Sequence, residues 1–136
     1  MKRYEILEHK ADLKIKVKGS SKEELFLNAL LGMEEGLRPE TKETKEEIKR
    51  EIKIKSIDLP ALLVDFLNEA LYLIQVHKEI YNSIKFKKFV DTELKGELIG
   101  QKVERFGEDI KAVTYHDLDI YQKEDGTWEA VVLFDI

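Results

Sequence analysis

The sequence contains no cysteine. This absence excludes disulfide bonds, thiolate nucleophiles and zinc sites with cysteine ligands, and it is compatible with a reducing cytoplasm. Histidine is also scarce and occurs only as His9, His77 and His116. A classical zinc site would therefore need histidines and carboxylates from segments that are far apart in the chain.

Several motifs that carry phosphate or acyl chemistry are missing as well. The sequence has no glycine-rich phosphate loop, no Gly-x-Ser-x-Gly turn and no His-Glu-x-x-His pair. The N-terminal residues do not resemble a signal peptide, and no apolar run approaches the roughly 18–20 residues that span a bilayer. We therefore expect a cytoplasmic protein that does not contact a membrane.

The amino-acid composition of the chain predicts one domain covering residues 1–136. Hydrophobic residues make up 43% of the chain and charged residues 38%, which allows a buried core beneath an ionic surface. The chain has 23 basic and 28 acidic residues, a net charge of −5. Because affinity for a phosphate backbone rests mostly on Lys and Arg, we expect no stable direct binding of nucleic acid. An acidic surface suits divalent cations or a basic protein partner better.

The first third of the chain predicts two strands and a helix. Apolar residues alternate with polar ones at 4–7 and 13–17, which is typical of half-buried strands. Ser20 and Ser21 each stand three residues before a glutamate, so they predict a capped helix start. We expect this helix to end at Gly36.

A second helix follows a strand predicted at 48–55. Asp58 is a favourable N-cap and Pro60 is tolerated in the first turn, so the helix is expected to run from there to about His77. Its broad apolar face predicts burial. The opposite side carries a polar stripe at i, i+3, i+4 and i+7, which we interpret as a solvated face. The stripe consists of Asp65, Asn68, Glu69 and Tyr72.

The remainder of the chain predicts antiparallel strands. They include a mixed run at 112–122 and a last strand at 127–134, joined by a hairpin at Asp125-Gly126. Strand pairs joined by hairpins alternate with longer connections that contain the helices. This order predicts an α+β fold, a two-layer sandwich with two helices packed on a mostly antiparallel β-sheet.

The candidate site combines residues from the two ends of the chain. His9 and Asp12 lie at the turn between the first two strands, and are either solvated turn residues or half of a site. Asp135 ends the last strand, and Ile136 adds a terminal carboxylate. If the last strand pairs with the N-terminal one, these oxygens converge on one cation. Carboxylates of this kind suit calcium, magnesium or manganese.

Four segments of the sequence resemble the archease family. Residues 8–12, Glu-His-Lys-Ala-Asp, are similar to its Glu-His-Thr-Ala-Asp opening, and residues 62–72 resemble its Leu-Leu-Val-Asp-Trp-Leu-Asn-Glu-Leu-Leu-Tyr helix. Residues 110–116 match its Val-Lys-Ala-Val-Thr-Tyr-His segment, and the end of the chain matches its last hairpin with the closing Asp-Ile. Lys10 stands where the family has Thr, and Phe66 where it has Trp. The segments occur in the family's order over nearly the whole chain.

The resemblance implies a non-catalytic activator of the RtcB-type RNA ligase, which joins tRNA halves during tRNA splicing. Archeases stimulate guanylylation and multiple turnover of that ligase and broaden its nucleotide use. The resemblance further implies that Asp12, Asp135 and Ile136 bind a divalent metal, described as calcium in the family. His9, Asp65 and His116 match motif positions and become candidates for contact with the partner or for support of the metal ligands.

Two other functions remain open at this point. The chain could be a metal-dependent hydrolase that uses His9 or His116 as a general base beside a bound cation. It could also be a chaperone-like interaction module whose acidic residues are only solvated. Turnover of phosphoesters would support the hydrolase, and a melting temperature unaffected by divalent cations would support the interaction module.

Overall fold

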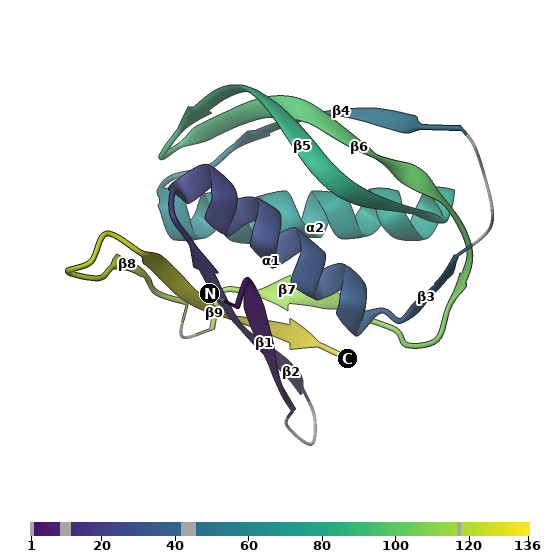
Figure 1. The fold of residues 1–136 in the computed structure, drawn as a ribbon, viewed down its shortest axis with the longest axis horizontal. Helices are drawn as coiled ribbons and strands as arrows, with labels where there is room; N and C mark the ends of the chain where they lie inside the picture. The colour runs from purple at the N-terminus through teal and green to yellow at the C-terminus, as the bar shows by residue number, and fades with distance from the viewer. Residues whose placement is uncertain (1, 9–11, 42–45, 117) are drawn as a thin grey trace.

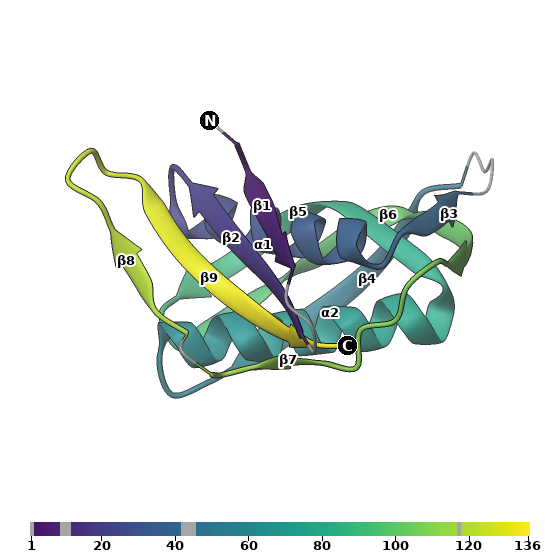
Figure 2. The same ribbon diagram turned by 90° about the horizontal axis from the view of Figure 1, so that it is seen from below.

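The computed structural model in Figures 1 and 2 describes residues 2–8, 12–41, 46–116 and 118–136. His9 and Lys10, which belong to the expected site and its family motif, lie outside the described residues. The helices are α1 (Lys22–Gly36) and α2 (Leu59–His77). The strands are β1 (Tyr4–Glu8), β2 (Asp12–Gly19), β3 (Pro39–Thr41), β4 (Ile48–Lys55), β5 (Glu79–Val90), β6 (Glu93–Phe106), β7 (Ala112–Thr114), β8 (Ile120–Gln122) and β9 (Trp128–Asp135).

The two helices lie between two antiparallel sheets (Figure 1). One sheet has the order β1-β2-β9-β7, with β8 also paired to β9, and the other has β6 between β4 and β5 with β3 at the far end of β6. The expected α+β class, with two helices packed on antiparallel strands, is confirmed. The sequence did not predict that the strands divide into two sheets, because alternation identifies a strand but not the strands with which it pairs.

The pairing of β2 with β9 brings the two ends of the chain together. Leu13, Ile15 and Val17 of β2 lie opposite Phe134, Val132 and Ala130 of β9, and all of them are buried. The intervening lysines of β2 point to the other side of the sheet, as the alternation predicts. Strands β2 and β9 lie side by side in Figure 2, and their register places Asp12 directly opposite Asp135.

Helix α1 begins with the predicted capping box, which uses both serines. The Ser21 hydroxyl accepts a hydrogen bond from the Glu24 amide at 3.1 Å. The Glu24 carboxylate accepts from the amide of Ser20 at 3.1 Å and from its hydroxyl at 2.9 Å. These bonds satisfy amide groups that the first turn of a helix leaves open. The helix ends at Gly36, as predicted, and the chain leaves it through Arg38 at a φ of 48°.

Helix α2 corrects one expectation from the sequence. It is 19 residues long with a mean hydropathy of 1.4, so by length and composition it could cross a membrane, although no run of that kind was expected. In this fold Leu62, Phe66 and Ile74 are completely buried between the sheets. We therefore interpret α2 as the central core helix. Asp58 caps it as predicted, accepting from the Ala61 amide at 2.8 Å.

The C-terminal half differs in detail from the predicted strands. The run at 112–122 forms two short strands, β7 and β8, with His116 in the turn that follows β7 rather than in a strand. The hairpin at Asp125-Gly126 is confirmed between β8 and β9, with Gly126 at a φ of 90°. Residues 39–41, for which no strand was predicted, form β3 against the end of β6. Strands of this length carry too few residues for a period to show.

Candidate functional site

Asp12 and Asp135 face each other at one end of the β2–β9 pair. Asp12 is the first residue of β2 and Asp135 the last of β9, and they are partners in the register. Side chains at directly opposite positions point to the same side of a sheet, with Cβ atoms about 4.5–5.5 Å apart. Like charges at directly opposite positions destabilise a sheet, and a cation between the two carboxylates would remove this effect.

One oxygen of Asp12 has no hydrogen-bond partner in the described structure although it is buried. This atom is Oδ1, in a side chain that is otherwise half-exposed. A buried carboxylate oxygen without a donor is energetically costly, because water no longer solvates it. A cation or a hydrogen-bond donor beside Oδ1 of Asp12 would remove this cost.

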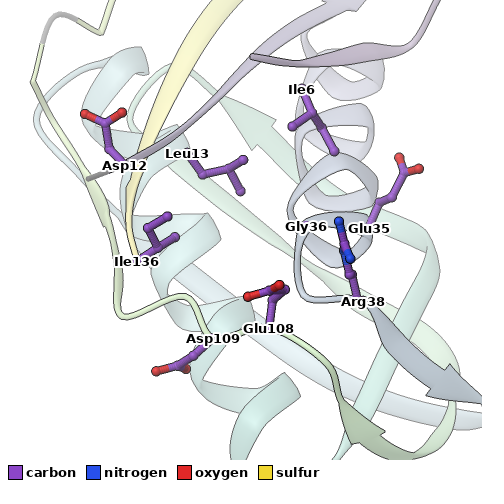
Figure 3. A pocket seen from close by; sticks show the side chains of 9 residues that line it. All are labelled: Ile6, Asp12, Leu13, Glu35, Gly36, Arg38, Glu108, Asp109 and Ile136. Atoms are coloured by element: carbon purple, nitrogen blue, oxygen red, sulfur yellow. The ribbon is translucent and has the colours of Figure 1, made fainter. Parts of the chain in front are cut away.

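Beside this pair lies an acidic pocket of about 460 Å³ (Figure 3). Its charged lining residues are Asp12, Glu35, Glu108 and Asp109, with Arg38 as the basic member. The remaining walls come from Ile6, Leu13, Gly36 and Ile136. In Figure 3, Ile136 lies between Asp12 and Asp109. The excess of carboxylates makes the pocket attractive to a cation or a basic side chain.

Gly36, which lines this pocket, packs closely against Leu13 of β2. A Cβ atom at this position would lie 2.8 Å from Cδ2 of Leu13, which is closer than the packing allows. The end of α1 can therefore approach β2 closely, with Glu35 on one side of the contact and Asp12 on the other.

The oxygen donors at this site fit a hard divalent cation. Among the described residues, no group of three or more His, Asp and Glu side chains is arranged to hold a metal ion. A site built on Asp12 and Asp135 thus needs a further oxygen, and Ile136 is the next residue along the chain. Carboxylate and backbone oxygens suit calcium, magnesium or manganese. Metal binding at Asp12, Asp135 and Ile136 stays a prediction.

The polar stripe of α2 is not simply solvated. Asn68 donates to the Val113 carbonyl at 3.0 Å and accepts from the Val113 amide at 2.8 Å. Asp65 accepts from the hydroxyl of Tyr115, and from that of Ser56 at 2.5 Å. The hydrogen bond to Asp65, followed by partial burial, raises the pKa of Tyr115. These bonds tie residues 113–115 to α2, while Glu69 and Tyr72 remain exposed as expected.

The structure does not bring His116 to the metal candidates. Ala112 of β7 lies opposite Asp135, and Thr114 lies opposite Leu133, so β7 runs away from Asp135 toward His116. His116 is exposed in the turn beyond the far end of β7. A general base at this position would therefore not act on a water bound between Asp12 and Asp135.

Three carboxylate residues of the pocket were not predicted from the sequence. Glu35 lies in the last turn of α1, and Glu108 and Asp109 follow β6 in a surface connection. Neighbouring acids after a glycine are a weak signal, because most such pairs are solvated loop residues. Only the fold shows that these two segments reach the same pocket as Asp12.

Comparison with known proteins identifies the family of this chain. The model of the Archease protein family (MTH1598/TM1083) matches residues 4–136. The chain belongs to the archease family. The archease of Methanosarcina barkeri is 38% identical to it over 143 residues, covering 99% of this chain and 97% of the relative. The archease of Pyrococcus abyssi is 33% identical over 144 residues and covers all of both chains.

Two solved structures share the archease fold with this chain. The solution structure of protein 1598 from Methanobacterium thermoautotrophicum is 32% identical, with a TM-score of 0.70 over all of both chains. The crystal structure of an archease from Thermotoga maritima, described as a possible chaperone, is 26% identical. It has a TM-score of 0.66 and covers 96% of this chain and 94% of its own.

The archease-like segments 62–72 and 110–116 are the ones that the hydrogen bonds of Asp65 and Asn68 join. Phe66, which replaces the family's Trp, is completely buried against Phe26, with ring centroids 5.6 Å apart. Phe66 is therefore part of the core packing between α1 and α2.

Proposed function

We propose that this archease is a cytoplasmic, non-catalytic activator of the RtcB-type RNA ligase. In this proposal it promotes guanylylation and multiple turnover of the ligase and broadens its nucleotide use. The acidic pocket at the end of β2 and β9 is the surface that meets the ligase. The observation that carries the proposal is the pairing of Asp12 with Asp135 beside this pocket in a member of the archease family.

The proposed role of the pocket is to handle a divalent cation at the boundary with the ligase. Asp12, Asp135 and an oxygen of Ile136 would hold the ion, which is calcium by the family resemblance. A bound cation would neutralise the repulsion between the two aspartates. It would also complement the buried Oδ1 of Asp12. These carboxylates are thus suited to place or exchange metal ions at the nucleotide site of the ligase.

The test measures ligase guanylylation with variants of the two aspartates. We expect Asp12→Ala and Asp135→Ala to reduce stimulation at least tenfold, because each removes a hard oxygen donor and half of the carboxylate pair. The assay uses the cognate ligase with GTP and manganese, and follows the nucleotide covalently bound to it.

Glu124→Ala is the matched control. It removes the same charge from an exposed position in the β8–β9 turn, on another part of the surface. It should stimulate like the wild type. Full stimulation by both aspartate variants, with melting curves that show them folded, would refute the role of the carboxylates.

A chaperone-like function is the second candidate, and one surface feature favours it. Tyr72 and Val76, one turn apart on α2, are 57% and 56% exposed. The Thermotoga archease is described as a possible chaperone. This function predicts that the protein suppresses thermal aggregation of the ligase regardless of Asp12, whereas Tyr72→Ser would weaken the suppression.

A further inference from the structure

The outer face of the β4–β6–β5 sheet gathers cations on a chain whose net charge is −5. The helices cover the other face of this sheet (Figure 1). We define the lysine face as the charged residues that alternation and register place on the outer side, together with the bulged Lys87. Its lysines are Lys49, Lys53, Lys55, Lys85, Lys87, Lys88 and Lys95, against Glu51, Glu93 and Glu97.

The centre of the lysine face is a row of like charges. Lys95 of β6 lies directly opposite Lys53 of β4 and directly opposite Lys88 of β5. Neighbouring strands are about 4.8 Å apart, and like charges at opposite positions destabilise a sheet. Lysine on an edge strand can serve to block aggregation, but Lys95 is on the central strand, where that explanation does not apply.

Much of this charge is not neutralised within the protein. Lys55 and Lys88 both pair with Glu93, and Lys87 pairs with Glu51 at 3.5 Å. Lys49 pairs with Glu47 at 4.0 Å, so among the described residues the lysines of this face without an ion pair are Lys53, Lys85 and Lys95. A hollow of about 300 Å³ lies between Lys53, Lys87 and Lys95, and Glu51, the ion-pair partner of Lys87, also lines it.

We propose that the lysine face binds the phosphodiester backbone of RNA. Flexible lysine side chains with three donors each are suited to phosphate oxygens, and Lys53 and Lys95, which have no ion-pair partner, are directly opposite each other in the sheet. The uncharged residues that the register places on the outer side are Ile80, Ser83, Val90, Ile99 and Gln101. Since none of them is aromatic, bases have no stacking surface here, and the contact is independent of base sequence.

This contact is local and depends on salt. The net charge of −5 argued against stable binding over the whole surface, and the rest of the chain is more acidic than this average because the lysine face is basic. The face lies on the opposite side of the helices from β9, whose end carries the acidic pocket (Figure 1). RNA and a protein partner at the pocket can thus be bound at the same time.

The test measures binding of a short fluorescent RNA duplex to the full chain by anisotropy. We expect affinity to fall steeply between about 50 and 200 mM salt. The double variant Lys53→Gln/Lys95→Gln should weaken binding at least fivefold. It should also reduce the slope of log K against log salt by about two, one for each lost phosphate contact. Lys85→Gln/Lys87→Gln, on exposed positions of β5, provides a second test if the first variant unfolds.

Lys14→Gln/Lys111→Gln is the control, because it removes the same charge elsewhere on the molecule. An equal loss with this control, or no RNA binding by the wild type at low salt, would overturn the proposal. Equal binding of polyglutamate or of phosphatidylserine vesicles would overturn the assignment to RNA. The proposal is independent of ligase activation. Stimulation of guanylylation without RNA should be unchanged in Lys53→Gln/Lys95→Gln, and its loss would mean that the face contacts the ligase instead.

Discussion

Glu34 is a carboxylic acid placed in the core. It lies on α1 with only 6% of its surface exposed, and it accepts a hydrogen bond from the Tyr81 amide at 2.5 Å. Burial raises the pKa of Glu34 to about 8, although the bond from Tyr81 opposes the shift. At neutral pH the folded protein therefore holds Glu34 mostly in its neutral form.

The raised pKa predicts that the protein loses stability as the pH rises from about 4.5 to about 8. In this window the unfolded chain has released the proton of Glu34 and the folded chain still holds it. The free energy of unfolding then falls by up to about 1.4 kcal/mol per pH unit. Glu34→Gln keeps an acceptor for Tyr81 and cannot ionise, so it should remove this part of the pH dependence.

Urea unfolding at several pH values measures the effect. We expect the variant to be more stable than the wild type above pH 8, with the difference disappearing toward pH 4.5. Parallel pH profiles for the two proteins would show that Glu34 ionises normally in the fold.

At the scale of elements, β7 depends on α2. One edge of this short strand pairs with β9, and Asn68 satisfies both backbone groups of Val113 on the other edge. Gln75 adds a bond to the Ile110 carbonyl at 2.9 Å. A side-chain carboxamide thus takes the place of a neighbouring strand, and it also closes an edge that could pair with another chain.

Removal of this carboxamide should release β7. Asn68→Ala leaves the amide and the carbonyl of Val113 without partners, which costs about 1–3 kcal/mol per group where water cannot replace them. We expect faster hydrogen exchange at residues 110–115 and a lower melting temperature. Glu69→Ala, at the exposed neighbouring position on α2, should change neither. Unaltered exchange in Asn68→Ala would mean that β9 alone holds β7.

Loss of the hydrogen bonds between Asn68 and β7 should also affect the candidate site. The Lys111 amide donates to the Asp135 carbonyl at 2.7 Å, and Ala112 lies opposite Asp135. Because β7 thereby fixes the backbone of Asp135, Asn68→Ala should stimulate the ligase less than Glu69→Ala does, in the guanylylation assay above.

At the scale of the whole molecule, metal binding should appear as a change in stability. A ligand that binds only the folded state at 100 times its Kd adds about 2.7 kcal/mol. We expect calcium to raise the melting temperature of the wild type and not that of Asp12→Asn.

In the absence of metal, we do not expect Asp12→Asn to lower the melting temperature. Asp12→Asn removes the repulsion with Asp135, so its melting temperature in EDTA should equal or exceed that of the wild type. Glu124→Gln should respond to calcium like the wild type. A calcium effect of the same size in Asp12→Asn would place the ion elsewhere.

The sequence by itself determined the two helices, the longer strands and the α+β class of the fold. Alternation gave β2, β4 and β9, and capping residues gave the starts of both helices, because these signals depend on neighbours within a few residues. The motifs at both chain ends also identified Asp12 and Asp135 as one candidate site. Binding of a cation by these two residues is still a prediction.

The tertiary structure alone decided which distant residues meet. It divided the strands into two sheets and brought Glu35, Glu108 and Asp109 to the pocket of Asp12. It also showed that Asn68, in the polar stripe of α2, forms two hydrogen bonds with the backbone of β7. A net charge of −5 likewise says nothing about position, whereas strand register places Lys53, Lys95 and Lys88 in one row. The physical reason is common to all of these: strand pairing and helix packing fix long-range neighbours, and local sequence patterns carry no record of them.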